Sequence, residues 1–412
     1  MLRRHGAKLS EMLLCEIARR PGGTFLMHHL HRRLPADWTI QSYEPDMGLD
    51  YPHAAFIVGV PDFHLLRPEM AAARGEPHVC DQVPSDVLAF LQSGKGRLLI
   101  DMSNEAPEVD DLACGYLADW LVSADIDPAR VIYLSANARL ASDVAAFGMD
   151  AALFDFFNLE LAYKFRRELR GELRKLELVW PRRDWSSPML CLNETPRGHR
   201  VALMACLAAD GFAQSHFVSW GGWKHSKAVG LADLALAQAR EILAAGAPDA
   251  LPFLDAVACL DRVSFEDAGS TGNELAFEFP SVLYASSAFS LVSESGVSPG
   301  VHRLSEKSIK ALAGGHLPVI WGSEKSRSLL EAYGFDPIAP DHVWSYDLVE
   351  PAGARLSALR EVYRGCIDRT LVDPGDHVDQ LLGNIAFAHE GFEEHLWNLM
   401  GSPLMTALTQ LD

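Results

Sequence analysis

Apolar and polar positions alternate along most of the chain in two patterns, short apolar runs of strand length and longer stretches with helical spacing. In the first half, the runs that we expect to be strands lie at 54–60, 97–100 and 131–134, and the helical stretches between them lie at 85–92 and 111–122. Strands that alternate with helices in this way predict a parallel α/β architecture.

The chain changes character at 180–188, a polar, proline-bracketed stretch that we interpret as a linker. Beyond it a second α/β series begins. Strands are expected at 189–192, 216–220, 289–293 and 317–321, and helices at 198–209, at 231–245 and from Ser305 and Ser323. The pattern therefore predicts two domains, 1–180 and 189–375, followed by a helical segment, 376–412.

The N-terminal stretch begins with Arg3 and Arg4, but its apolar part is broken by Glu11 and Glu16. This spacing predicts an amphipathic helix and argues against a signal peptide. No run approaches the ~18 consecutive apolar residues that a membrane span needs. The seven cysteines are odd in number, scattered and mostly set in apolar segments, so we expect reduced core thiols and a cytoplasmic protein.

The composition narrows the classes of partner. The chain has 36 Lys and Arg against 55 Asp and Glu, a formal net charge of −19, and 49% of its residues are hydrophobic. The hydrophobic content excludes a disordered chain. The negative charge repels a polyphosphate backbone, which disfavours sequence-independent binding of duplex nucleic acid and favours a small or uncharged partner.

The most informative segment, 289–322, has the pattern of a strand, a loop, a helix and a strand. Ser305 is placed to cap the helix, so that Glu306 and Lys307 lie in its first turn, where free backbone N–H groups and the helix dipole attract anions. Lys307 can neutralise a diphosphate there, and Glu306 can accept hydrogen bonds from sugar hydroxyls. The alternative is a plain capped helix, because Ser323-Glu324-Lys325-Ser326 repeats the same four residues.

This segment resembles the signature of the α1,3/4-fucosyltransferase family and its bacterial and phage relatives. In that family a strand ends in Phe-Glu-Asn-Ser, and a loop, Thr-Glu-Lys, a helix and Val-Pro-Val-Val-x-Gly follow. Here Glu294, Glu306, Lys307 and Leu317-Pro318-Val319-Ile320-Trp321-Gly322 stand in that order. Glu294 is followed by Ser, and Ser305 replaces the Thr, which leaves the donor base and sugar open.

A second block supports the resemblance, since the family has a strand that ends in Ser-Asn and, after six residues, an Arg that opens a helix. Asn193 and Arg200 keep that spacing, and the resemblance places Arg200 against the donor diphosphate. Arg197, at the same helix start, is the reserve candidate for this bidentate contact. Lys224, at another strand end, is a weaker candidate, because most lysines are solvated.

The family also has a Glu-x-Pro motif after a strand in its first half, and Glu105-Ala106-Pro107 fits it after the strand expected at 97–100. Loops at the carboxyl ends of parallel strands face the ligand. Glu105 and Asp101 are therefore the carboxylates best placed to take the proton of an acceptor hydroxyl, and we favour Glu105. A carboxylate that only stabilises a helix start is the competing interpretation of Glu105.

The resemblance implies a GT-B arrangement of two Rossmann-like domains, with the nucleotide on the second, the acceptor on the first and C-terminal helices that pack back toward the first. It implies an inverting, metal-independent glycosyltransferase that moves a sugar from a nucleotide-diphospho-sugar to a hydroxyl of a glycan or another acceptor, without a cofactor. Asp125 and Asp127 mimic a metal-binding Asp-x-Asp pair, but no strand precedes them. The alternatives are a relative that glycosylates modified nucleic acid and a non-catalytic relative that binds a nucleotide or sugar.

Overall fold

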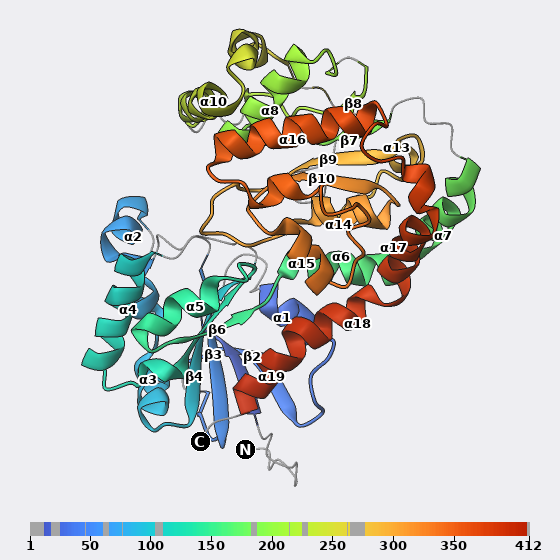
Figure 1. Ribbon diagram of the computed structural model, residues 1–412. Helices are drawn as coiled ribbons and strands as arrows, with labels where there is room; N and C mark the ends of the chain where they lie inside the picture. The colour runs from blue at the N-terminus through green and yellow to red at the C-terminus, as the bar shows by residue number, and fades with distance from the viewer. Residues whose placement is uncertain are drawn as a thin grey trace. The chain divides into compact units, whose positions relative to one another are not determined.

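The structure is a computed structural model, and the chain divides by its internal contacts into two compact units. The residues that it describes are 12–17, 25–45, 47–60, 66–75, 77–103, 110–182, 188–213, 215–224, 230–261, 263 and 277–409. Unit 1 consists of the residues up to Leu159 and from Leu396 onward, and unit 2 of Glu160–His395. Each unit contains a parallel sheet with helices, as the alternating pattern predicts (Figure 1).

Unit 1 is built on a six-stranded parallel sheet in the order β2-β1-β3-β4-β5-β6. Its strands are β1 Met12–Glu16, β2 Trp38–Ser42, β3 His53–Gly59, β4 Gly96–Met102, β5 Val131–Ser135 and β6 Asp150–Leu153. From β1 the chain adds β2 on one side, and from β3 onward it adds strands on the other side. The direction of winding therefore reverses between β1 and β3, a topological switch point.

The first-half strands expected from the pattern are confirmed as β3, β4 and β5. The amphipathic helix expected near the N-terminus is wrong, because residues 12–16 form β1, whose five residues are all buried. A strand buried on both faces shows a continuous apolar run instead of alternation. The run is short, and Glu11 before it and Glu16 at its end have a spacing that also fits a helix.

Helices cover both faces of the unit 1 sheet. The helices are α1 Phe25–Leu30, α2 Pro68–Arg74, α3 Ser85–Gln92, α4 Asp111–Ser123, α5 Leu140–Val144, α6 Phe156–Arg167, which runs on into unit 2, and α19 Ser402–Thr409. Val87 of α3, Leu117 of α4 and Val144 of α5 join Phe56 and Ile100 of the strands in one hydrophobic core. On the opposite face, α1 is held to β4 by a hydrogen bond that is described below.

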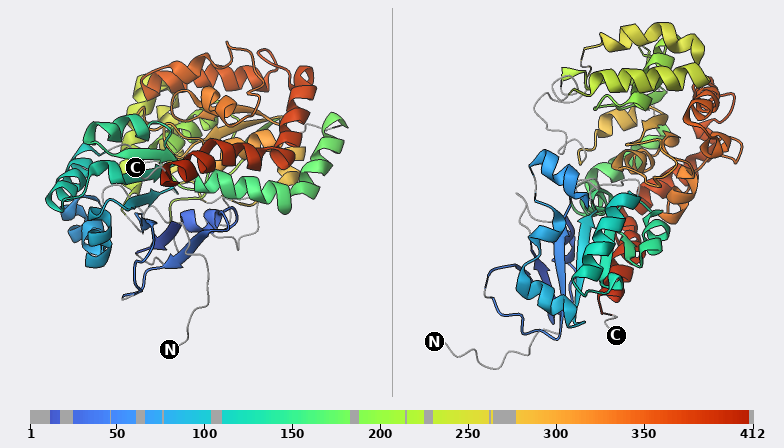
Figure 2. Two further views of the ribbon diagram at one scale, coloured as in Figure 1. Left: turned by 90° about the horizontal axis from the view of Figure 1, so that it is seen from below. Right: turned by 90° about the vertical axis from the view of Figure 1, so that its left-hand side faces the viewer.

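Unit 2 is built on a four-stranded parallel sheet in the order β10-β9-β7-β8. Its strands are β7 Met189–Cys191, β8 Phe217–Val218, β9 Phe289–Ser293 and β10 Leu317–Trp321. Its helices are α7 Arg170–Val179, α8 Gly198–Ala209, α10 Ala232–Gly246, α11 Leu254–Ala258, α13 Ser281–Ala285, α14 Glu306–Ala313, α15 Ser326–Ala332, α16 Ala352–Ile367, α17 Val378–Glu390 and α18 Phe392–Leu396. Helices α8, α10 and α16 pack together on one side of the sheet, and α14 and α17 on the other (Figures 1 and 2).

The boundary between the units lies before Glu160, upstream of the linker expected at 180–188. Trp180 belongs to unit 2, where its indole Nε1 donates a hydrogen bond to the Gly315 carbonyl at 2.7 Å. Helix α17 also belongs to unit 2, so only the last helical segment, from Leu396, is part of unit 1. A polar, proline-rich stretch marks a loop, but tertiary contacts decide to which unit its flanking helices belong. None of the described helices is long and apolar enough to cross a membrane.

Candidate functional site

The sheet of unit 2 has a switch point between β7 and β9. From β7 the chain adds β8 on one side of the sheet, whereas β9 and β10 lie on the other side. Open α/β sheets bind their ligands outside the carboxyl ends of the strands at such a point. Asn193 follows β7 and Glu294 follows β9, so two of the predicted residues lie there.

The side chain of Glu294, directly after β9, forms hydrogen bonds to the start of α14. This side chain is 2% exposed. Its carboxylate accepts hydrogen bonds from the backbone N–H of Ser305 (2.9 and 3.0 Å), the backbone N–H of Ser295 (3.2 Å) and the Ser308 hydroxyl (2.5 Å). A Cβ atom at Gly322, after β10, would lie 2.9 Å from the Glu294 Cγ, so the absence of a side chain there leaves room for this carboxylate.

The first turn of α14 has the capped geometry that the sequence predicts. The Ser305 hydroxyl accepts a hydrogen bond from the Lys307 N–H at 3.4 Å, and Lys307 Nζ lies 2.6 Å from Glu306 Oε1. Burial alone would raise the pKa of Glu306. The charge of Lys307, with contributions from Lys310 and Arg303, outweighs burial and lowers this pKa to about 2. Glu306 is therefore ionised at neutral pH and can only accept hydrogen bonds.

Arg200, in the first turn of α8, reaches the same strand end from the other side of the switch point. It is 3% exposed. Its guanidinium donates to the backbone carbonyls of Glu294 (2.9 and 3.3 Å), Ser293 (3.4 Å) and Thr195 (3.2 Å). Burial, and then the neighbouring charge of Arg197, lower the pKa of Arg200 to about 10, so the group is charged at neutral pH.

The guanidinium of Arg200 is not directly bonded to a carboxylate within the described part of the chain, because all four of its hydrogen bonds end on backbone carbonyls. A guanidinium has five N–H donors, so one donor of Nη1 remains. Arg197 donates to the carbonyl of Ser295 on the adjacent loop. The carboxylates of Glu294 and Glu306 act on this charge without a direct hydrogen bond and partly restore the pKa of Arg200. A buried cation without a directly bonded carboxylate is costly, and an anionic ligand would supply that contact.

Two further polar atoms at the switch point are buried without a partner. Asn193 is 1% exposed and Ser293 is fully buried. Among the described residues, neither Asn193 Oδ1 nor the Ser293 hydroxyl has a hydrogen-bond partner. Native proteins leave few buried polar atoms unsatisfied, and those that remain call for an explanation such as a ligand. Both atoms lie at the ends of the strands that flank the switch point.

His199, next to Arg200 in α8, is part of the same arrangement. Its Nε2 lies 2.9 Å from the Glu294 carbonyl oxygen, and its own carbonyl accepts a hydrogen bond from Trp321 Nε1 at 3.0 Å. Burial and the charge of Arg200 lower the pKa of His199 to about 3, so the imidazole is neutral and positions the end of β9.

The sequence pattern does not single out His199 or Ser308. Ser308 lies three residues after Ser305 on α14, so helical spacing is a signal that places the two serines on one face. Gly322 closes the motif that carries the resemblance, and the tertiary contact with Glu294 gives the physical reason for a glycine there. Lys224 is exposed, and it makes no hydrogen bond or ion pair within the described part of the chain.

The second Ser-Glu-Lys-Ser tetrapeptide does not reproduce the first. The helix expected to open at Ser323 begins instead at Ser326. Lys325 precedes it in a left-handed conformation with φ of 63°, and its backbone N–H donates to the Asp347 carbonyl at 3.3 Å. The same four residues therefore form a capped helix start at 305 and a turn at 323, which makes the second copy a structural control for the first.

The candidate bases belong to unit 1. Asp101 lies within β4 and is 4% exposed. Its carboxylate accepts hydrogen bonds from the backbone N–H groups of Leu26 (3.2 Å) and Ser103 (3.0 Å), which holds α1 against the sheet. These contacts give Asp101 a structural role. Glu105, the favoured base, lies outside the described residues, so its role stays a prediction.

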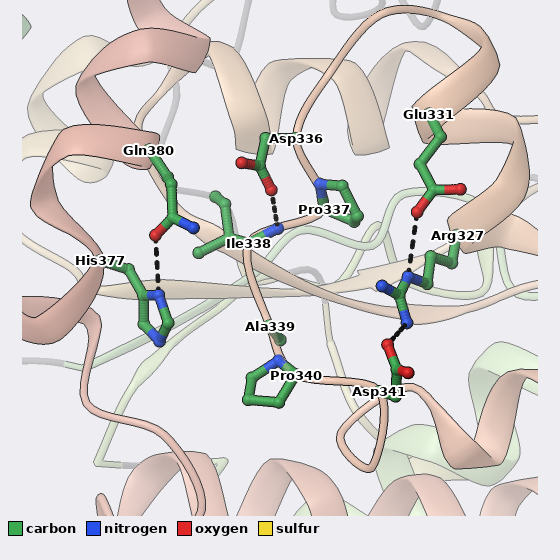
Figure 3. Close-up of a pocket in the computed structure, with 10 residues that line it drawn as sticks. All are labelled: Arg327, Glu331, Asp336, Pro337, Ile338, Ala339, Pro340, Asp341, His377 and Gln380. Atoms are coloured by element: carbon green, nitrogen blue, oxygen red, sulfur yellow. Dashed lines mark hydrogen bonds and ion pairs between the residues drawn. The ribbon is translucent and has the colours of Figure 1, made fainter.

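A separate pocket of about 400 Å³ in unit 2 lies beside α15 (Figure 3). Its wall includes Ile338, whose φ of 68° is rare for a β-branched residue and is supported by a 2.8 Å hydrogen bond from its N–H to the Asp336 carboxylate. Arg327 in this pocket is paired with Asp341 at 2.5 Å and with Glu331 at 3.2 Å. Because two carboxylates already neutralise the charge of Arg327, Arg327 is a weaker candidate than Arg200 for binding an anionic ligand.

The chain was compared with protein-family models and with curated protein sequences. No family model matches it, and no curated protein matches it. A functional proposal therefore has to be argued from the geometry at the switch point of unit 2.

Proposed function

We propose that the chain is an inverting, metal-independent glycosyltransferase of the GT-B type that uses a nucleotide-diphospho-sugar. Unit 2 binds the nucleotide at the switch point between β7 and β9. The observation that carries the proposal is the buried guanidinium of Arg200, which is charged, forms no direct ion pair among the described residues, and is linked through Glu294 to the capped first turn of α14.

Each group at this point has a task toward such a donor. The diphosphate receives charge-assisted hydrogen bonds from the remaining Nη1 donor of Arg200 and from Lys307, in addition to the N–H groups of the helix start. The ionised Glu306 accepts hydrogen bonds from hydroxyls of the sugar or ribose. The same positive groups stabilise the negative charge that develops on the departing diphosphate.

The reaction is a single displacement. The acceptor oxygen attacks the anomeric carbon from the face opposite the diphosphate, the bond from that carbon to the β-phosphate oxygen breaks, and the configuration inverts. The nucleoside diphosphate leaves with the electron pair of the broken bond. The proton of the acceptor hydroxyl goes to a carboxylate of unit 1, for which Glu105 is the candidate.

A thermal-shift screen of the full chain against GDP, UDP, CMP and their sugars tests the proposal. A ligand at a concentration of 100 times its Kd stabilises the folded chain by about 2.7 kcal/mol, a shift of several degrees. We expect a nucleoside diphosphate and its sugar to produce such a shift, and the chain to release nucleoside diphosphate from that sugar. The absence of a shift with every compound would contradict the proposal.

The second candidate is a protein that binds a nucleotide sugar without transferring the sugar. The observation that favours it is the carboxylate of Asp101, the candidate base that the structure describes, which is already hydrogen-bonded to two backbone N–H groups. A nucleotide-sugar-dependent thermal shift without any release of nucleoside diphosphate would support this candidate.

A further inference from the structure

The pocket beside α15 is a part of unit 2 that the proposed function does not use (Figure 3). Its volume of about 400 Å³ lies in the range of small-molecule sites. Its lining comes from α15, from the 336–341 segment and from the start of α17, which all belong to unit 2. None of these lining residues takes part in the site at the switch point, so the pocket is a separate feature of the unit.

The 336–341 segment is held in one conformation by hydrogen bonds around it. The buried side-chain amide of Asn384 in α17 accepts from the backbone N–H of Asp336 at 2.9 Å and donates to its carbonyl at 2.8 Å. The Asp336 carboxylate in turn holds the left-handed Ile338. Ala339 closes a tight turn around Ile338, because its N–H donates to the Pro337 carbonyl at 2.8 Å. A residue in so unfavourable a conformation persists only where its surroundings determine it, so this wall of the pocket is pre-formed.

The pocket has an apolar middle and polar sides. Residues 337–340 supply two prolines, an isoleucine and an alanine, and Figure 3 shows this segment between the polar lining side chains. On one side, His377 Nδ1 lies 2.8 Å from Gln380 Oε1. On the other side, Arg327 lies against Glu331. This lining matches a ligand that has an apolar body and polar ends.

The charges of the lining favour a cation. Three carboxylates, those of Glu331, Asp336 and Asp341, stand against the one guanidinium of Arg327. One oxygen of Asp336 accepts from the Ile338 N–H, and one oxygen of each of the other two carboxylates accepts from Arg327. The second oxygen of each carboxylate makes no hydrogen bond or ion pair with another described residue. These oxygens are acceptors, and the N–H groups of an ammonium ion are donors that match them.

We infer that this pocket binds a small organic cation with an aliphatic body, a linear alkyl diamine. Two ammonium groups balance the excess of two negative charges in the lining, and the methylene chain between them packs on residues 337–340. The pocket therefore selects a ligand of the opposite charge to that of the switch point, which presents Arg200 and Lys307. The inference does not rest on the proposed function.

Ligand-observed NMR titrations of the full chain at low salt test the inference with compounds that share a four-carbon chain, namely 1,4-diaminobutane, butylamine, 1,4-butanediol and succinate. We expect diaminobutane to bind most tightly, butylamine more weakly, and the diol and the dicarboxylate not to bind. Asp336→Asn keeps the acceptor for the Ile338 N–H and removes one charge. It should weaken diaminobutane about two- to fivefold, the range for exposed ion pairs. The double variant with Asp341→Asn should lose the preference for diaminobutane over butylamine.

The matched control is Asp119→Asn, which removes an exposed carboxylate from α4 in unit 1 and should leave every titration unchanged. This control is needed because a chain with a net charge of −19 attracts any cation. The inference is overturned if neither amine binds, if succinate binds best, or if Asp119→Asn weakens diaminobutane as much as Asp336→Asn does. Nucleotide affinity should be the same in all these variants, so failure of this pocket and failure of the site at the switch point are separate results.

Discussion

The substitution Glu294→Gln tests how the nucleotide site is assembled. The carboxylate is 2% exposed and accepts four hydrogen bonds, from Ser305 to both oxygens, from Ser295 to Oε2 and from Ser308 to Oε1. The lower-cost orientation of the amide places its nitrogen at the Oε1 position, where the Ser308 hydroxyl can turn and accept. The N–H groups of Ser305 and Ser295 then donate to a neutral amide oxygen, the Ser308 hydroxyl accepts from the amide nitrogen, and the Ser305 N–H loses its contact at the Oε1 position. All three groups therefore interact with a neutral amide instead of a charged carboxylate. At about 1 kcal/mol for each such change, we expect a loss of ~3 kcal/mol in the free energy of unfolding.

Urea unfolding of Glu294→Gln measures this loss. The control is Glu331→Gln in α15, where the side chain is 51% exposed and pairs with Arg327 at 3.2 Å, and where we expect a change of less than about 0.5 kcal/mol. The nucleotide affinity of Glu294→Gln should fall as well, because the carboxylate positions the start of α14. A Glu294→Gln protein within about 1 kcal/mol of the wild type would refute the reasoning, since hydrogen bonds to a buried carboxylate cannot then hold β9 to α14.

Three further predictions concern charges elsewhere in the chain. Asp210→Asn should cost ~3 kcal/mol in urea unfolding, because its carboxylate forms a 2.6 Å ion pair with the buried Arg360. The pKa of Glu306 is lowered from 4.5 to about 2, so its stabilising contribution is complete above pH 4.5 and is lost as the pH falls from there toward 2. The difference in unfolding midpoint between wild type and Glu306→Gln should shrink over that range; a constant difference would contradict this pKa. Glu105→Gln should lower the transfer rate by ~10² to 10⁴ without changing nucleotide affinity, whereas Asp101→Asn should mainly destabilise unit 1; normal transfer by Glu105→Gln would exclude it as the base.

The sequence predicts best the bounds of those helices and strands whose hydrophobic pattern, including the residues that start and end them, lies within one short segment. The strands at 289–293 and 317–321 and the helices at 85–92 and 198–209 have the expected bounds. The strand β1 differs, because five buried residues have no periodicity that separates a strand from a short helix. Pairing with β2 and β3 on both sides fixes it as a central strand, and that information lies in distant parts of the chain.

The candidate site was predictable in its local parts and not in its assembly. Helix-start chemistry alone predicts the Ser305 cap and the position of Lys307. The contact of Arg200 with the end of β9 depends on β7 and β9 being neighbours in the sheet, although β8 follows β7 in the sequence. The turn at Lys325 also depends on a distant residue, because its backbone N–H is bonded to the Asp347 carbonyl and α15 begins only at Ser326.

The most direct test of the central claim is a calorimetric titration of the preferred nucleoside diphosphate into the wild type, Arg200→Ala, Lys307→Ala and Lys325→Asn. Asparagine tolerates the left-handed backbone at 325, so this control removes only the charge of the second tetrapeptide. The account predicts that the first two variants bind 1.5 to 3 kcal/mol more weakly, about 10- to 150-fold, while Lys325→Asn binds as the wild type does. Unchanged affinity in both Arg200→Ala and Lys307→Ala would contradict a nucleotide site at the end of β7 and β9.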